Sequence, residues 1–135
     1  MGCDIHAHLE IKIYDKWEHY SIVPIKRNYK LFGKLAGIRD ECETPIAKDR
    51  GLPDDITVVT RLDRNYYGTD GHGDSFITWD EIIDLVKFYD GIGSNIGDMH
   101  QDVYAGISLF GDGLYAKSSV SYYVADVRMV FWFDN

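Results

Sequence analysis

Polar and apolar residues alternate near the start of the chain. From Cys3 to Ile13 every odd position is apolar. The even positions all carry a polar side chain: Asp4, His6, His8, Glu10 and Lys12. A period of two is the pattern of a β-strand, whose successive side chains point to opposite faces of a sheet. We therefore predict a strand with its odd residues in the core and its even residues outside.

The residues that follow predict a β-hairpin. Asp15-Lys16 has the composition of a tight turn, and apolar residues resume beyond it. If the turn is a two-residue loop, the facing pairs are Tyr14 with Trp17, Ile11 with Tyr20, and Leu9 with Ile22. Both faces of the first strand then stay consistent across the pair.

Two helices are predicted from caps and periodicity. Asn28 is a good N-cap for residues 29–36, and Gly37 is placed to end that helix. Its apolar face consists of Leu31, Phe32, Leu35 and Ala36. A second helix over 79–89 begins at the capping-box pattern Thr78-Trp-Asp-Glu81.

The rest of the chain predicts fewer regular elements. The segments are a surface excursion over 38–55, a strand over 56–62, a Gly- and Asp-rich loop over 64–75, an unassigned stretch over 91–117 with a short strand at 103–110, and a long strand from Ser118 onward. With strands at both ends and helices between, we expect one α+β domain over 1–135 with a mainly antiparallel sheet.

Charge narrows the classes of partner. The chain has 22 acidic and 14 basic residues and a formal net charge of −8. A phosphate backbone is repelled by such a surface at long range, which argues against direct nucleic-acid binding. No apolar run is long enough to cross a bilayer, so we expect a cytoplasmic protein without a membrane anchor.

Two clusters of histidine and aspartate are candidates for a metal centre. Asp4, His6 and His8 share one face of the predicted first strand, and Asp70, His72 and Asp74 alternate in the predicted loop. Imidazole and carboxylate ligands suit zinc or manganese. If the loop folds over the strand, Asp4, His6, His8, His72 and Asp74 become ligands of a divalent metal.

A metal at this place would give hydrolytic chemistry. The cation acidifies a bound water, Asp70 acts as a base or further ligand, and Arg39 or Arg50 holds an anionic substrate. The alternative is that the polar residues of the strand are simply the solvated face of an antiparallel sheet. The residues alone leave both alternatives open.

Several separate segments together resemble a known group of proteins. They are MGCDIH at residues 1–6, NYKLFGKLAGIR at 28–39, RGLPDD at 50–55, DGHGDSFITWDE at 70–81 and the ending VFWFDN. The chain is thereby similar to a group of small uncharacterised proteins encoded by bacteriophages and prophages. The group has no established catalytic residues to carry over, and it more often has Ser-X-Ser-Trp where this chain has Gly73 to Phe76.

Two functions follow as expectations. The first is a metal-dependent hydrolase, phosphoesterase-like, acting on a small molecule. The second is a non-enzymatic accessory protein that binds or sequesters a host protein or a nucleotide signal during takeover of the host or against its defence. The resemblance implies that either would act in the cytoplasm of an infected or lysogenic bacterium. Whether the protein is an enzyme, and its oligomeric state, are left open by the sequence.

Overall fold

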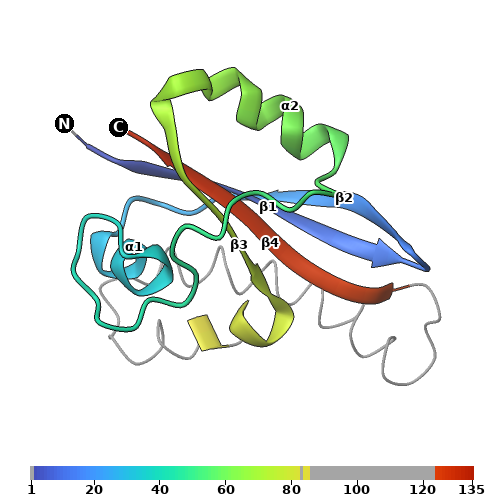
Figure 1. Ribbon diagram of the computed structural model, residues 1–135, viewed down its shortest axis with the longest axis horizontal. Coiled ribbons are helices and arrows are strands. Elements are labelled where there is room, and N and C mark those ends of the chain that lie inside the picture. Colours follow the sequence, from blue (N-terminus) through green and yellow to red (C-terminus); the bar gives the residue numbers. More distant parts are fainter. Residues whose placement is uncertain (1, 83, 86–123) are drawn as a thin grey trace.

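The computed structural model describes residues 2–82, 84–85 and 124–135 (Figure 1). Within these residues a sheet of antiparallel strands has the order β2-β1-β4-β3. The strands are β1 (Asp4–Ile13), β2 (Lys16–Val23), β3 (Gly71–Thr78) and β4 (Val124–Asp134). The predicted α+β class is confirmed, with an N-terminal and a C-terminal strand side by side in the middle of the sheet.

Two helices cover opposite faces of this sheet. The helices are α1 (Tyr29–Ala36) and α2 (Val58–Tyr67), and α2 runs into a short 3₁₀ turn, η1 (Gly68–Asp70). Figure 1 shows α2 above the strands and α1 below them. Of the described helices, none combines the length and apolar character required to cross a membrane.

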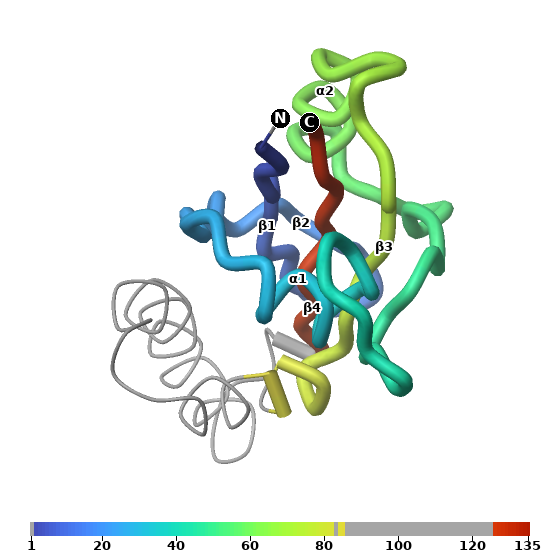
Figure 2. The backbone as a smooth tube through the Cα atoms, turned by 90° about the vertical axis from the view of Figure 1, so that its left-hand side faces the viewer, coloured from blue at the N-terminus to red at the C-terminus, as the bar shows by residue number. Residues whose placement is uncertain are grey.

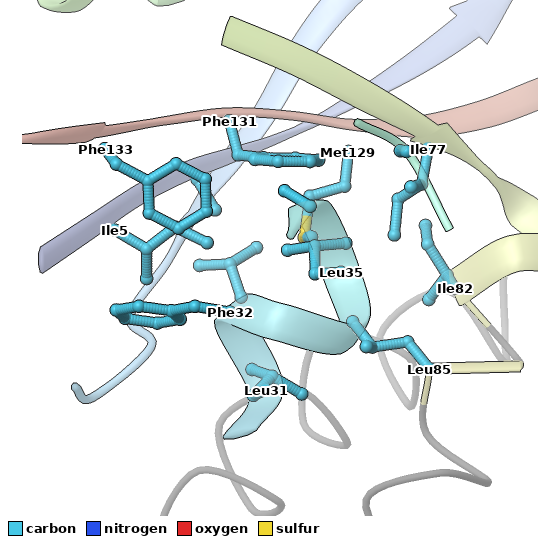
Figure 3. Close-up of a cluster of buried hydrophobic side chains, with 14 of the residues drawn as sticks. Ile5, Leu31, Phe32, Leu35, Ile77, Ile82, Leu85, Met129, Phe131 and Phe133 are labelled. Carbon is cyan, nitrogen blue, oxygen red and sulfur yellow. The ribbon is translucent and has the colours of Figure 1, made fainter. Parts of the chain in front are cut away.

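The apolar core lies between the sheet and α1. Phe32 of α1 packs edge-on against Phe133 of β4 with ring centres 5.2 Å apart, and Ile5 of β1 lies in the same cluster. Figure 3 shows these side chains meeting those of Leu35 and Phe131 in one layer. The odd residues of β1 therefore point into the core near its start, as the alternation predicts.

The predicted caps are confirmed. The side chain of Asn28 accepts a hydrogen bond from the amide of Leu31 at 3.2 Å, and Gly37 ends α1 in the left-handed region with φ of 68°. The amide of Thr78 donates to Glu81 at 3.0 Å, and residues 79–82 and 84–85 are helical. The rest of the predicted 79–89 helix, the 91–117 stretch and the 103–110 strand lie outside the described residues.

Two predicted elements between these helices are wrong. Residues 56–62 were expected to form a strand but belong largely to α2, and much of the 64–75 loop is helix, η1 and the first part of β3. Val58 and Val59 favour strands intrinsically, yet helical packing against the sheet overrides that preference.

The hairpin is present, but its predicted register is wrong. Ile13 pairs with Lys16, so the loop is Tyr14-Asp15, and Tyr14 takes a positive φ of 54°. The earlier loop shifts the pairing by two residues from the prediction, and a bulge at Leu9/Glu10 reduces this shift to one, so Leu9 lies opposite Ser21 rather than Ile22. A single extra residue of this kind is invisible in the alternation of the sequence.

The even face of β1 is also covered, which the solvated-face alternative did not anticipate. His8 is 1% exposed and Glu10 is 0% exposed. The hydroxyl of Thr60 in α2 donates a hydrogen bond to Glu10 at 2.8 Å. This side of the sheet is therefore a buried polar layer under α2.

Candidate functional site

The two clusters predicted from the sequence come to the same end of the sheet. β1 begins at Asp4 and β3 begins at Gly71, and both residues are register partners of Asp134 near the end of β4. Figures 1 and 2 show the start of β1 and the end of β4 side by side close to α2. The clusters therefore converge in the plane of the sheet, with one strand between them.

That intervening strand places the two predicted histidines on different faces. His6 lies opposite Trp132, whereas His72 lies opposite Phe133 and stacks on its ring. Neighbouring residues of a strand point to opposite faces. His6 and His72 therefore do not face one another, and the expected folding of the loop over the first strand is wrong.

We use the name sheet-end cluster for six side chains at this place. Three lie on the α2 side and three on the α1 side: His6, Tyr67 and Asp134, and Arg39, His72 and Asn135. The two halves meet because Asp134 and Asn135 are consecutive residues, with Cα atoms about 3.8 Å apart.

His6 is held between an acid and a phenol. Its Nε2 lies 2.6 Å from Oδ1 of Asp134, and the hydroxyl of Tyr67 lies 3.1 Å from its Nδ1. An ionised carboxylate only accepts, so Nε2 carries the proton, and in neutral imidazole Nδ1 then accepts from Tyr67. This chain of hydrogen bonds fixes the tautomer and the orientation of His6.

Tyr67 stays protonated at neutral pH. Burial raises the pKa of Tyr67, and the nearby carboxylates of Asp63 and Asp134 raise the pKa further. A phenol in this state donates or relays a proton and does not act as a tyrosinate nucleophile.

A pocket gives access to His6. It has a volume of about 390 Å³ and lies between the first half of β1 and the end of β2. Its charged or titratable lining residues are His6, Lys26 and Asp63. The side chain of His6 is 24% exposed, so a small molecule in the pocket can reach the imidazole.

On the α1 side, two donors point at one oxygen. Nη2 of Arg39 and Nε2 of His72 each lie 3.2 Å from Oδ1 of Asn135. Within the described residues no carboxylate pairs with Arg39, which is exposed. Donors converging on a partly negative oxygen, with further N–H groups to spare, suit an anionic group.

Arg39 also adopts an uncommon backbone conformation. Its φ is 65°, in the left-handed region that residues with a Cβ rarely occupy. Its guanidinium lies 5.7 Å from the ring centre of Tyr29 and beside the Cys3 thiol. Burial raises the pKa of Cys3, with Arg39 partly opposing, so the thiol is neutral.

Other predicted site residues are engaged elsewhere. Asp4 accepts two hydrogen bonds from Arg27, at 2.9 and 3.1 Å, and these hold the pKa of Asp4 below its usual range. Asp74 pairs with Arg64 at 2.8 Å. Asp70 is exposed in η1.

Arg50 and His8 also lie outside the sheet-end cluster. Arg50 makes a two-pronged ion pair with Glu81 at 2.6 Å. Nε2 of His8 lies 2.7 Å from Asp63, and its Nδ1 lies 2.9 Å from His19. Arg50 and His8 therefore make structural contacts, whereas the sequence suggested a substrate-binding residue and a metal ligand.

The predicted metal-ligand set is thus divided among separate contacts. Among residues 2–82, 84–85 and 124–135, no group of three or more His, Cys, Asp or Glu side chains is arranged to hold a metal ion. A zinc or manganese centre gains no support from this geometry and stays a prediction from the sequence.

Tyr67, Asp134 and Asn135 were missed at the sequence level. Antiparallel pairing of the two terminal strands would have placed Asp134 beside Asp4, because the start of one strand then lies opposite the end of the other. Tyr67 carried no such signal, since its helix was taken for a strand and a loop.

His19 makes stability depend on pH. Burial lowers the pKa of His19, and the neighbouring His8 lowers it further. The unfolded state then binds more protons just below the ordinary pKa of histidine, so stability falls on acidification. We expect the melting temperature to drop between about pH 7.5 and about pH 5, and to drop less in His19→Gln. An equal drop in both proteins would contradict this role.

Comparison with known proteins assigns the chain to no family, so the fold and the site alone describe it. No protein family model matches the chain, and no curated protein or solved structure matches it. The structure shows an α+β protein with an antiparallel sheet and a hydrogen-bonded chain of Asp134, His6 and Tyr67 at one end of that sheet.

Proposed function

We propose that the protein is a hydrolase that cleaves a small phosphate ester at the sheet-end cluster. The observation that carries this proposal is the hydrogen-bonded chain from Asp134 through His6 to Tyr67 beside an open pocket. A carboxylate that orients an imidazole, with a hydroxyl on the other ring nitrogen, is an arrangement suited to proton transfer.

The substrate is expected to be anionic. Arg39 and His72 supply donors on one side of the sheet end, and Lys26 lines the pocket on the other. A guanidinium matches the geometry of phosphate oxygens and remains charged at all relevant pH values. These groups also offset locally the net charge of −8, which would otherwise repel an anion.

The proposed step is attack of water on phosphorus. A bond forms from the water oxygen to phosphorus and the ester P–O bond breaks. The proton of the water passes through the Tyr67 hydroxyl to Nδ1 of His6, and Asp134 stabilises the resulting imidazolium. The leaving oxygen takes up that proton when His6 returns to its neutral form.

Binding without turnover is the second candidate. The exposed Arg39 and His72 would serve equally in a protein that sequesters a phosphate-bearing signal of the host. The resemblance to phage proteins is consistent with either activity, in the cytoplasm of an infected or lysogenic bacterium.

The two candidates are separated by one assay. Purified protein is incubated with bis(p-nitrophenyl) phosphate and with p-nitrophenyl phosphate, each with EDTA, with added zinc or manganese, and with neither. Release of p-nitrophenol by the wild type supports the hydrolase. Turnover that needs the metal would restore the metal-dependent form of the proposal. Saturable binding without release in any condition would favour sequestration.

Arg39 provides a test of anion binding. We expect Arg39→Gln to weaken binding of p-nitrophenyl phosphate about 10- to 100-fold, the effect of losing a charge-assisted hydrogen bond. Isothermal titration calorimetry measures this change, with Arg61→Gln as the control because Arg61 is exposed on α2. Equal weakening in both variants would show a general charge effect and contradict the assignment.

A further inference from the structure

α2 presents its apolar residues away from the protein. Its one buried residue is Thr60. Its large apolar residues are exposed, with fractions of 71% for Val58, 50% for Val59, 65% for Leu62 and 83% for Tyr66. A helix lying on its own sheet normally turns its apolar stripe inward.

The inward side of α2 is instead occupied by polar contacts. Thr60 donates to Glu10, Asp63 accepts from His8, and Arg64 donates to Asp74. Apart from Tyr67, whose ring packs against Trp132, the apolar residues of α2 therefore add nothing to the core of their own chain. Clustered exposed apolar residues of this kind mark an interaction surface.

This apolar flank is turned toward β2. Val59 lines a cavity of about 440 Å³ together with Trp17 and His19 of β2. Positions 59, 62 and 66 are three and four residues apart, so they share one side of the helix. Leu62 and Tyr66 therefore continue the flank that Val59 begins.

β2 is at the same time the outer strand of the sheet. Among the described residues it pairs with β1 alone, so its other side is an edge. Ile22 of β2 is 64% exposed and lines a pocket together with Asp63 of α2. The unpaired backbone N–H and C=O groups of an edge strand can pair with a further strand, and the apolar flank of α2 can pack on that strand.

We propose that the strand added at this edge is β2 of a second copy of the chain, paired antiparallel about a two-fold axis. The axis crosses the sheet at the seam, so both α2 helices lie on one face of a continuous sheet. Each apolar flank faces its own edge, so the two flanks meet across the seam. This single interface pairs the backbone groups of the edge strand and buries Val59, Leu62 and Tyr66 in both copies.

Charge along the edge permits this self-pairing. Lys16 and Glu18 are exposed on β2 and carry opposite charges. The seam thus has no excess of either sign, although each chain carries −8 overall. The dimer does not rest on the proposed hydrolase activity, although Ile22, which lies on the edge strand, also lines the pocket beside His6.

Sedimentation equilibrium tests the proposal on the full chain. The wild type should have twice the 15.5 kDa mass of one chain. Leu62→Asp should raise the dimer dissociation constant at least about tenfold. Arg61→Gln makes the same change of charge on the same helix at an exposed position off the flank, and should remain a dimer. A monomeric wild type at all concentrations, or a Leu62→Asp variant as dimeric as Arg61→Gln, would overturn the proposal.

A second measurement locates the seam. Ile22→Cys places an exposed thiol on β2, the strand at the seam, and should form an intermolecular disulfide under mild oxidation, whereas Asp54→Cys, exposed before α2, should not. Circular dichroism of Leu62→Asp should match the wild type, because the replaced side chain is 65% exposed. Equal cross-linking of the two cysteine variants would contradict pairing through β2.

Discussion

Replacing Arg128 by leucine is expected to lower the free energy of unfolding by about 3–5 kcal/mol, the effect of leaving a buried charge without its partner. Glu10 is 0% exposed, and Nε of Arg128 donates to it at 2.8 Å. Arg128 itself is 7% exposed, pairs with Asp55 at 2.7 Å, and stacks on Trp17 at 4.0 Å. The substitution would leave Glu10 charged beneath α2.

The state of Glu10 supports this size of effect. Burial raises the pKa of Glu10, but hydrogen bonds from Thr57, Thr60 and Arg128 outweigh burial and hold the pKa below its usual value. A carboxyl with a lowered folded pKa contributes stability above its unfolded pKa and loses it as pH falls. Loss of Arg128 removes one of the hydrogen bonds that stabilise the charged form of Glu10.

Urea unfolding measures the change. Arg27→Leu is the control, because its partner Asp4 is exposed and such pairs contribute little. The double variant Glu10→Leu/Arg128→Leu should be less destabilised than the sum of the two single variants, since it removes both charges together. If Arg128→Leu lowers the free energy of unfolding by less than about 1 kcal/mol, the Glu10–Arg128 pair does not stabilise the polar layer to the extent expected.

The largest expected effect on activity comes from His6. We expect His6→Gln to lower kcat for p-nitrophenyl phosphate or its diester by about 10²- to 10⁴-fold, the range for loss of a general base. Tyr67→Phe should reduce kcat as well, because it removes the hydroxyl that hydrogen-bonds Nδ1 of His6 while keeping the ring, whose centre lies 4.1 Å from that of the imidazole.

Two comparisons make this result specific. His19→Gln removes a histidine outside the sheet-end cluster and should leave kcat within about threefold, a difference below 1 kcal/mol. Asp134→Asn should lower kcat and shift its pH profile, because the amide no longer fixes the tautomer of His6. Equal kcat in His6→Gln and the wild type would exclude His6 as the base.

Local signals in the sequence predicted much of the fold. Alternation over 3–13 predicted β1, and Asn28 with Gly37 predicted both ends of α1. Such signals depend on neighbours in the chain, so the sequence contains them directly. α2 was missed because it begins with Val58 and Val59, whose β-branched side chains favour a strand, although positions 59, 62 and 66 keep helical spacing.

The candidate site depended more on long-range pairing. His6, His72 and Arg39 were singled out from the sequence, and all three lie at the sheet end. Their partners Asp134 and Asn135 are brought there by pairing of strands far apart in the chain, which no local pattern specifies. The same pairing inserts β4 between the two histidines, so they do not form the single pocket expected for a metal.

The most direct test of the account is an NMR titration of the ¹⁵N-labelled protein with p-nitrophenyl phosphate. We expect saturable amide shifts at 4–6, 39, 71–73 and 134–135, and their loss in Arg39→Gln. Shifts confined to the cavity beside Trp17, or no saturable shift at all, would contradict the assignment of the sheet end as the functional site.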